Sequence, residues 1–129
     1  ETETQGPNTV AYLYDKNGNQ ILRTAGGVEE RFTHDYRNRV KMYEKGPVGA
    51  PSTSYMYKFT PTDERIAKVN ILSSTGNEEW YMYDGQDVTA DYTRSGSSGA
   101  LTLARTYVNG RAIDSKIARI EASGAIYFY

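Results

Sequence analysis

Apolar and polar residues alternate along most of this chain with the period of two that is typical of β-strands. Val40 and Met42, for example, alternate with Lys41 and Tyr43. Glycine- and asparagine-rich segments separate the alternating runs. The pattern predicts four strand pairs, 10–15 with 20–24, 28–34 with 39–44, 55–59 with 65–72, and 78–83 with 88–92, followed by a strand over 101–108.

Turn signals lie between these predicted strands. Asn17-Gly18 favours a two-residue hairpin, because such a turn needs positive φ at both central residues. Pro61 would interrupt a central strand, so we place it in a turn. Three isoleucines within residues 113–120 have helical spacing. They cover only about two helical turns, too few to be stable alone, so we predict a strand there.

A short word recurs along the chain: an aromatic-x-aromatic triplet, followed in most copies by aspartate. The copies begin at Tyr12, Phe32, Tyr55 and Tyr81, which are 20, 23 and 26 residues apart, and Tyr107 follows 26 residues later. A unit of this length predicts stacked supersecondary units. The predicted structural residues of the repeat are Tyr12, Tyr14, Asp15, Gly18, Phe32, Asp35, Arg39, Tyr55, Tyr57, Arg65, Tyr81, Tyr83, Asp84 and Tyr107.

Composition indicates a folded chain with a thin core. Leu, Ile, Val and Phe make up 22 of the 129 residues, but the chain also has 12 Tyr and a net charge of only −1. Tyrosine buries its ring and keeps its hydroxyl available, which suits a sheet with a wet face. We expect an all-β fold of four to five stacked antiparallel hairpins in a twisted, curved sheet over residues 10–129, after a flexible lead-in over 1–9.

Several function classes are disfavoured. The basic residues are scattered, so nucleic acid is not an expected partner. The chain has no Cys, hence no disulfide or thiolate metal site. No apolar run approaches the ~20 residues of a membrane span. We expect no enzymatic activity, no metal and no cofactor.

The recurring aspartates Asp15, Asp35 and Asp84 could form a row of carboxylates for catalysis or calcium. Capping of turns is the favoured interpretation, since aspartate commonly accepts hydrogen bonds from backbone N–H groups ahead of it. His34 is the chain's one histidine and occupies a repeat position, so we expect a structural role. Arg39 and Arg65 are expected to pair with neighbouring carboxylates.

Trp80, Tyr81 and Tyr83 suggest a second possibility, a flat platform for sugar rings. Aromatic residues at regular spacing are more typical of packing than of ligand binding, so we favour aromatic stacking between neighbouring hairpins. The platform stays open as an alternative.

The word Tyr-x-Tyr-Asp, followed by Gly-Asn or Asn-Arg and a β-branched residue, resembles the YD repeat of the Rhs family. This family includes bacterial polymorphic toxins, wall-associated proteins and the animal teneurins. The segments 105–110 and 127–129 resemble the closing part of an Rhs core. His34 replaces the second Tyr of the second copy, and Lys58 stands where the third Asp is expected.

The resemblance implies a fragment of a β-shell that encloses a toxin or effector polypeptide, in a protein that is secreted or displayed at the cell surface. Its partners would be further repeats of the parent chain or the enclosed effector. The first residue is Glu1, and the chain looks like a piece of a longer one. We therefore expect open sheet edges that promote self-association.

Overall fold

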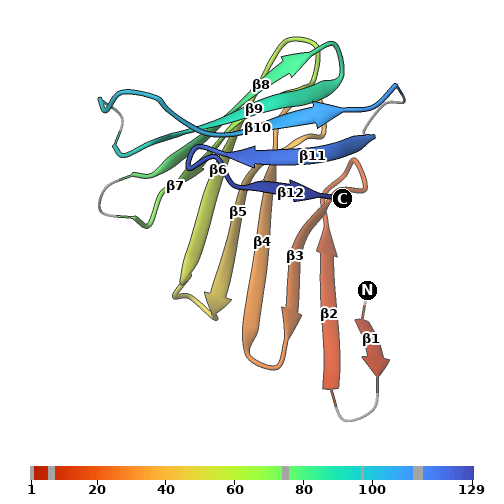
Figure 1. Cartoon of the computed structure of the whole chain (residues 1–129). Helices are drawn as coiled ribbons and strands as arrows, with labels where there is room; N and C mark the ends of the chain where they lie inside the picture. Colours follow the sequence, from red (N-terminus) through yellow and green to blue (C-terminus); the bar gives the residue numbers. More distant parts are fainter. Residues whose placement is uncertain (1, 6–7, 74–75, 97, 112–114) are drawn as a thin grey trace. The chain divides into compact units, whose positions relative to one another are not determined.

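The computed structural model describes residues 2–5, 8–73, 76–96, 98–111 and 115–129 (Figure 1). All of their regular elements are β-strands, and strands that follow one another in sequence are neighbours, which confirms an all-β fold of antiparallel hairpins. No helix able to cross a membrane is found among the described residues. The strands are β1 (Thr2–Gln5), β2 (Asn8–Tyr14), β3 (Gln20–Ala25), β4 (Val28–His34), β5 (Val40–Pro47), β6 (Thr53–Phe59), β7 (Arg65–Asn70), β8 (Glu78–Asp84), β9 (Asp87–Arg94), β10 (Thr102–Asn109), β11 (Lys116–Glu121) and β12 (Ile126–Phe128).

The chain divides into two compact units. Unit 1 contains Glu1–Tyr57 and Asn70–Leu72, and unit 2 contains Lys58–Val69 and Ser73–Tyr129. Strands β6 and β7 each contribute residues to both units. The predicted strand over 113–120 corresponds to β11, while residues 112–114 lie outside the described part of the chain.

Of the flexible lead-in expected over residues 1–9, residues 1, 6 and 7 lie outside the described part of the chain, and Thr2–Gln5 form strand β1. Strand β1 pairs with β2 from Thr2 opposite Ala11 to Gln5 opposite Asn8. Backbone N–H and C=O groups make these bonds, so a polar sequence can pair once a neighbouring strand offers its edge.

Three hairpins share a local irregularity. The strand register shifts by one residue between Leu13 and Tyr14, between Thr33 and His34, and between Met82 and Tyr83. Each shift is a β-bulge opposite the second aromatic position of the repeat, with the extra residue on the partner strand (Ile21, Lys41 and Thr89). Because a bulge bends its strand and increases its twist, the repeat imposes the same deformation on each of these hairpins.

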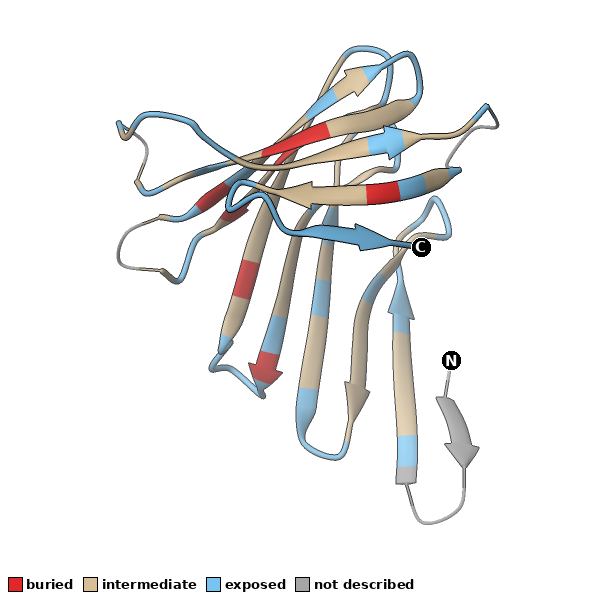
Figure 2. Ribbon diagram, in the orientation of Figure 1, coloured by how far each residue is buried: buried red, intermediate tan, exposed pale blue. Residues whose placement is uncertain are grey.

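Little of either unit is buried (Figure 2). Among the residues whose burial is described, four apolar ones are buried, Ala67, Val69, Ala90 and Ala118, and all belong to unit 2. In the described part of unit 1 the buried positions are Gly46 and Ser54. Large apolar side chains such as Phe128, 79% exposed, remain at the surface. Contacts other than a hydrophobic core must therefore contribute much of the stability.

Candidate functional site

The turns of the first two repeats are built in the same way. The Asp15 carboxylate accepts hydrogen bonds from the backbone N–H groups of Asn17 and Asn19, both at 2.9 Å. The Asp35 carboxylate accepts from the N–H groups of Arg37 at 2.8 Å and Arg39 at 3.1 Å. These bonds form the capping arrangement expected of the recurring aspartate.

Side chains reinforce both caps. Asn19 donates a second bond to Asp15 through its amide, and the Arg39 guanidinium binds the Asp35 carboxylate at 2.6 Å. The bond from Asn19 holds the pKa of Asp15 below its ordinary value, and the bond from Arg39 does the same for the pKa of Asp35. Both groups stay ionised near neutral pH, which suits a cap that only accepts hydrogen bonds.

The third turn has the same geometry around a different residue. Thr60 N donates to Glu64 O at 2.9 Å, just as Asp15 N donates to Asn19 O and Asp35 N to Arg39 O. The Thr60 hydroxyl accepts from the N–H groups of Thr62 and Glu64. Thr60, rather than Lys58, is thus the structural counterpart of the repeat aspartate.

Because Thr60 corresponds to the repeat aspartate, the third aromatic triplet lies two residues later than the sequence pattern predicted. The aromatics that precede the cap are Tyr57 and Phe59, whereas the sequence pattern pointed to Tyr55 and Tyr57. A search for the aromatic-x-aromatic-Asp motif misses a cap formed by threonine. The threonine hydroxyl accepts hydrogen bonds from the same backbone N–H groups as the aspartate carboxylate.

One residue of each turn takes the left-handed conformation. It is Gly18 at φ 84°, Asn38 at φ 61° and Asp63 at φ 79°. The expected two-residue Asn-Gly hairpin is therefore a longer turn, closed between residues 15 and 19, in which Gly18 takes the left-handed position. Glycine, asparagine and aspartate are the residues that tolerate this conformation best.

The fourth copy turns differently. Asp84 pairs with Asp87 across a two-residue turn that contains Gly85 at φ 60°. Asp84 is exposed, and this turn is too short for the cap seen at Asp15 and Asp35. Its hairpin keeps the bulge of the repeat but not the capped turn.

The first two capped turns also touch one another. The Asn38 side-chain oxygen accepts hydrogen bonds from the amide groups of Asn17 at 3.3 Å and Asn19 at 2.8 Å. Successive hairpins of unit 1 are thus joined at their turns as well as along their strands.

A carboxylate lies at the centre of unit 1. Glu30 binds Arg23 at 2.9 Å and Lys45 at 3.0 Å, and accepts a hydrogen bond from the Tyr43 hydroxyl at 3.2 Å. The bond from Lys45 is the main reason that the pKa of Glu30 lies below its ordinary value, and the bond from Arg23 adds to it. Glu30 therefore ties β4 to both neighbouring strands, β3 and β5.

A second, more deeply buried carboxylate lies in unit 2. Glu78 accepts hydrogen bonds from the Trp80 indole N–H at 2.6 Å and from Arg94 at 2.5 Å, and its side chain is 5% exposed. Burial alone raises the pKa of Glu78. The bonds from Trp80 and Arg94 outweigh burial and leave the pKa below its ordinary value.

The opposite face of unit 2 carries a polar row. The Tyr107 hydroxyl donates to Asp91 at 2.6 Å, and Arg105 lies 3.6 Å from the same carboxylate. Burial, together with the bond to Asp91, raises the pKa of Tyr107 to about 12. The phenol stays protonated and serves as a hydrogen-bond donor, so this row is a structural network.

Aromatic residues of the repeat contact one another and also cations. The rings of Phe32 and Tyr43 meet at 5.3 Å within the hairpin of β4 and β5. Tyr12 faces Arg23 across the strands. Arg65 lies over the Tyr81 ring at 5.4 Å. Cations thus contact some of the aromatic rings of the repeat.

The residues of the candidate sugar platform lie on both faces of strand β8. Side chains alternate along a strand, so Trp80 points to one face and Tyr81 to the other. Tyr83 shares the face of Tyr81 and donates its hydroxyl to Arg65 O at 2.9 Å. A flat surface that uses all three rings is not formed.

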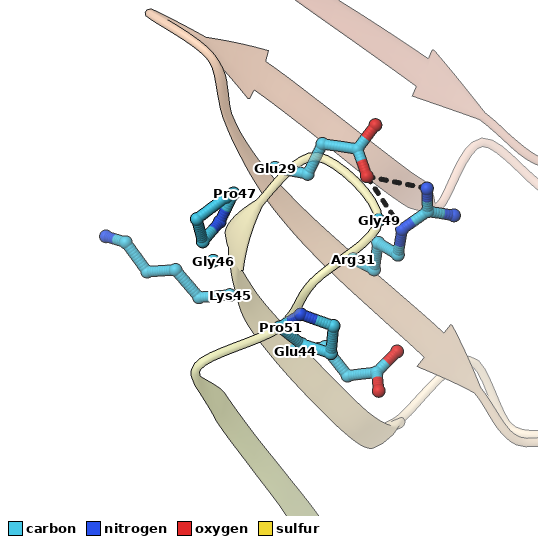
Figure 3. Close-up of a pocket in the computed structure, with 8 residues that line it drawn as sticks. All are labelled: Glu29, Arg31, Glu44, Lys45, Gly46, Pro47, Gly49 and Pro51. Atoms are coloured by element: carbon cyan, nitrogen blue, oxygen red, sulfur yellow. Dashed lines mark hydrogen bonds and ion pairs between the residues drawn. The ribbon is translucent and has the colours of Figure 1, made fainter.

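A hollow of about 300 Å³ lies in unit 1 at the loop that follows β5. Figure 3 shows the residues that line it. Glu29 and Arg31 are bonded to one another on its wall at 2.6 Å. Gly46 lies directly under the loop, where an added Cβ would come within 2.5 Å of Ser52 N. Lys45 of the wall pairs with Glu30, and Gly46 permits close backbone packing. We therefore interpret the hollow as part of the loop's structure.

A larger hollow of about 400 Å³ lies in unit 2. Its lining is mostly apolar and consists of Trp80, Tyr81, Met82, Tyr92 and Leu101. Ligand sites typically combine such a wall with a few polar groups at the edge. Of the predicted site residues, Trp80 and Tyr81 line this hollow.

No group of three or more potential metal ligands occurs among the described residues. His34 is partly buried beside the bulge between β4 and β5, and its Nδ1 lacks a hydrogen-bond partner. The chain matches no protein-family model, and no curated protein is similar to it.

Proposed function

We propose that this chain is a non-enzymatic structural module, a segment of an Rhs-type β-shell that encloses a toxin or effector polypeptide. The observation that carries the proposal is the turn shared by Asp15, Asp35 and Thr60, with the same backbone bonds each time. A turn that recurs in three successive repeats serves architecture, because catalysis needs one constellation.

Two further features support a wall. Each hairpin is followed directly by the next, so hairpins can be added without changing those already present. The small buried core means that a hairpin depends on its neighbours for stability. On this proposal the parent protein is secreted or displayed at the cell surface.

The proposal is tested on the full-length natural protein. Electron cryomicroscopy should reveal a closed wall built from successive hairpins, with a second polypeptide region inside it. Limited proteolysis should leave that inner region intact until the wall is opened with denaturant. A full-length protein whose non-repeat regions are all cleaved at once, with no enclosed density, would reject the shell.

A carbohydrate-binding or adhesion module is the second candidate, because Trp80 lines a hollow that is open to solvent. Trp80 is the chain's single tryptophan, so its fluorescence reports directly on that site. Retention on a glycan array that is lost in Trp80→Phe, with unchanged circular dichroism, would favour this candidate over the shell.

A further inference from the structure

The hollow of unit 2 has an apolar wall, and two cations contact the Trp80 ring that forms part of this wall. Met82, Tyr92 and Leu101 supply apolar surface beside the Trp80 ring. Directly opposite Trp80 on β7 is Ala67, which is fully buried. The small side chain of Ala67 leaves room on this face for larger residues of the adjacent strands.

Two cations lie against the Trp80 ring. Lys58 Nζ is 4.9 Å from the ring centroid, and the Arg94 guanidinium carbon is 5.5 Å from it. Both distances fall within the range of cation–π contacts. The Trp80 ring therefore belongs both to the apolar hollow and to a cluster with Lys58 and Arg94, here termed the cationic edge.

The charges at this edge do not cancel. Arg94 donates two hydrogen bonds to the Glu78 carboxylate, from Nη2 at 2.5 Å and from Nε at 3.1 Å. Lys58 acts on Glu78 only through its electrostatic field, which helps to lower the pKa of that carboxyl. With one carboxylate for two cations, the edge keeps a net positive charge next to an apolar hollow.

We propose that this hollow is a binding site for a small amphipathic anion, a carboxylate or sulfonate carried on an aromatic or aliphatic body. The body fills the hollow, and the anionic group takes the position beside Lys58. A buried apolar body gains free energy by leaving water, and an ion pair at a partly desolvated edge adds specificity for negative charge. The site does not depend on the shell proposal.

The test compares two probes that differ by one charged group. The probe 8-anilinonaphthalene-1-sulfonate is anionic, and N-phenyl-1-naphthylamine is the same ring system without the sulfonate. The full chain should bind one sulfonate probe with saturation and quench Trp80 by energy transfer. The neutral probe should bind about threefold to tenfold more weakly, as expected for loss of one partly exposed ion pair.

Two lysine variants isolate the charge. Lys58→Met keeps the apolar stem and should reduce affinity for the sulfonate to that for the neutral probe, without changing binding of the latter. The matched control is Lys68→Met, because Lys68 lies on the same unit but pairs with Glu79 on the opposite face. This control should bind both probes as the unaltered chain does.

Competition then identifies the ligand class. Octanoate should displace the sulfonate probe at lower concentration than 1-octanol, and Leu101→Ser should weaken both probes. Equal sulfonate affinity in Lys58→Met and the unaltered chain would overturn the proposal. So would equal loss of both probes in Lys58→Met, or displacement by a neutral oligosaccharide in place of octanoate.

Discussion

Units 1 and 2 each hold a carboxylate between strands, and the two carboxylates are bound in different ways. Glu30 of unit 1 pairs with Arg23 and Lys45, whose side chains are 39% and 50% exposed. Glu78 of unit 2 pairs with Arg94, whose side chain is 21% exposed, and takes a further bond from the Trp80 indole. The ion pairs of Glu30 in unit 1 are thus more accessible to water than the ion pair of Glu78 in unit 2.

The difference in burial of these ion pairs indicates how a sheet with little buried apolar surface is stabilised. Water competes for exposed ion pairs, which contribute little on average. A buried carboxylate that loses its partners is costly, so a satisfied one fixes a single register of its strands. We infer that Glu78 stabilises unit 2 more strongly, while unit 1 depends more on its capped turns.

Acid gives the largest expected effect, because it acts on both units at once. The pKa of Glu30 and that of Glu78 both lie below 4.5 in the folded chain. A carboxylate with a lowered folded pKa stabilises fully above its unfolded pKa, and this contribution is lost as pH falls through the folded value. Urea midpoints measured from pH 7 to pH 2 should therefore be steady down to about pH 5 and fall below it. A midpoint that rises below pH 4.5 would contradict these pKa directions.

Among single substitutions, Glu78→Gln should have the largest effect. It leaves the Arg94 charge without its carboxylate in a poorly hydrated place and should cost about 2–4 kcal/mol of unfolding free energy. Urea unfolding followed by far-ultraviolet circular dichroism measures this loss. The control is Glu79→Gln, the next residue on the opposite face, 51% exposed, which should cost less than about 0.5 kcal/mol. Equal losses in the two variants would show that burial of Glu78 does not matter.

Glu30→Gln should be milder than Glu78→Gln. Its cationic partners can turn to water, so we expect a loss of about 1 kcal/mol. The same urea experiment gives the ratio of the two losses. A loss as large as that of Glu78→Gln would remove the distinction between the two units.

The turn caps should give the smallest effect and test the repeat itself. Asp35→Ala and Thr60→Val each remove a side-chain oxygen that accepts two backbone N–H bonds, so both should lower the urea midpoint. Asp84→Ala alters a two-residue turn without this cap and should leave the midpoint unchanged. An unchanged midpoint in Thr60→Val, with a clear loss in Asp35→Ala, would show that the third turn is not equivalent to the second.

Much of the fold was predictable from local sequence. The period of two gave the strands, and the recurring aspartate gave the caps at Asp15 and Asp35, because both signals act over a few residues. The third cap escaped prediction since the aromatic word favoured Lys58, whereas a hydroxyl at Thr60 makes the same bonds. Polar composition likewise hid strand β1, whose pairing needs only backbone groups.

The charged clusters could not be read from the sequence. Glu78 and Arg94 are 16 residues apart in sequence, and they meet because β8 and β9 pair in a register that places them opposite one another. A bulge between Met82 and Tyr83 shifts this register by one residue. The alternation of Trp80 and Tyr81 across β8 was in principle visible, since adjacent strand residues face opposite ways. The hollow beside Trp80 was not, because Leu101 joins it from the segment before β10.

Double-mutant cycles on the two carboxylates test the difference between the units most directly, because a cycle isolates the pair from the rest of each substitution. One cycle combines Glu78→Gln with Arg94→Met, and the other combines Glu30→Gln with Arg23→Met. We predict a coupling of about 1–3 kcal/mol for Glu78 with Arg94, and at most half of that coupling for Glu30 with Arg23. Equal couplings, or a larger one for Glu30, would contradict the conclusion that the buried carboxylate of unit 2 stabilises its sheet more strongly.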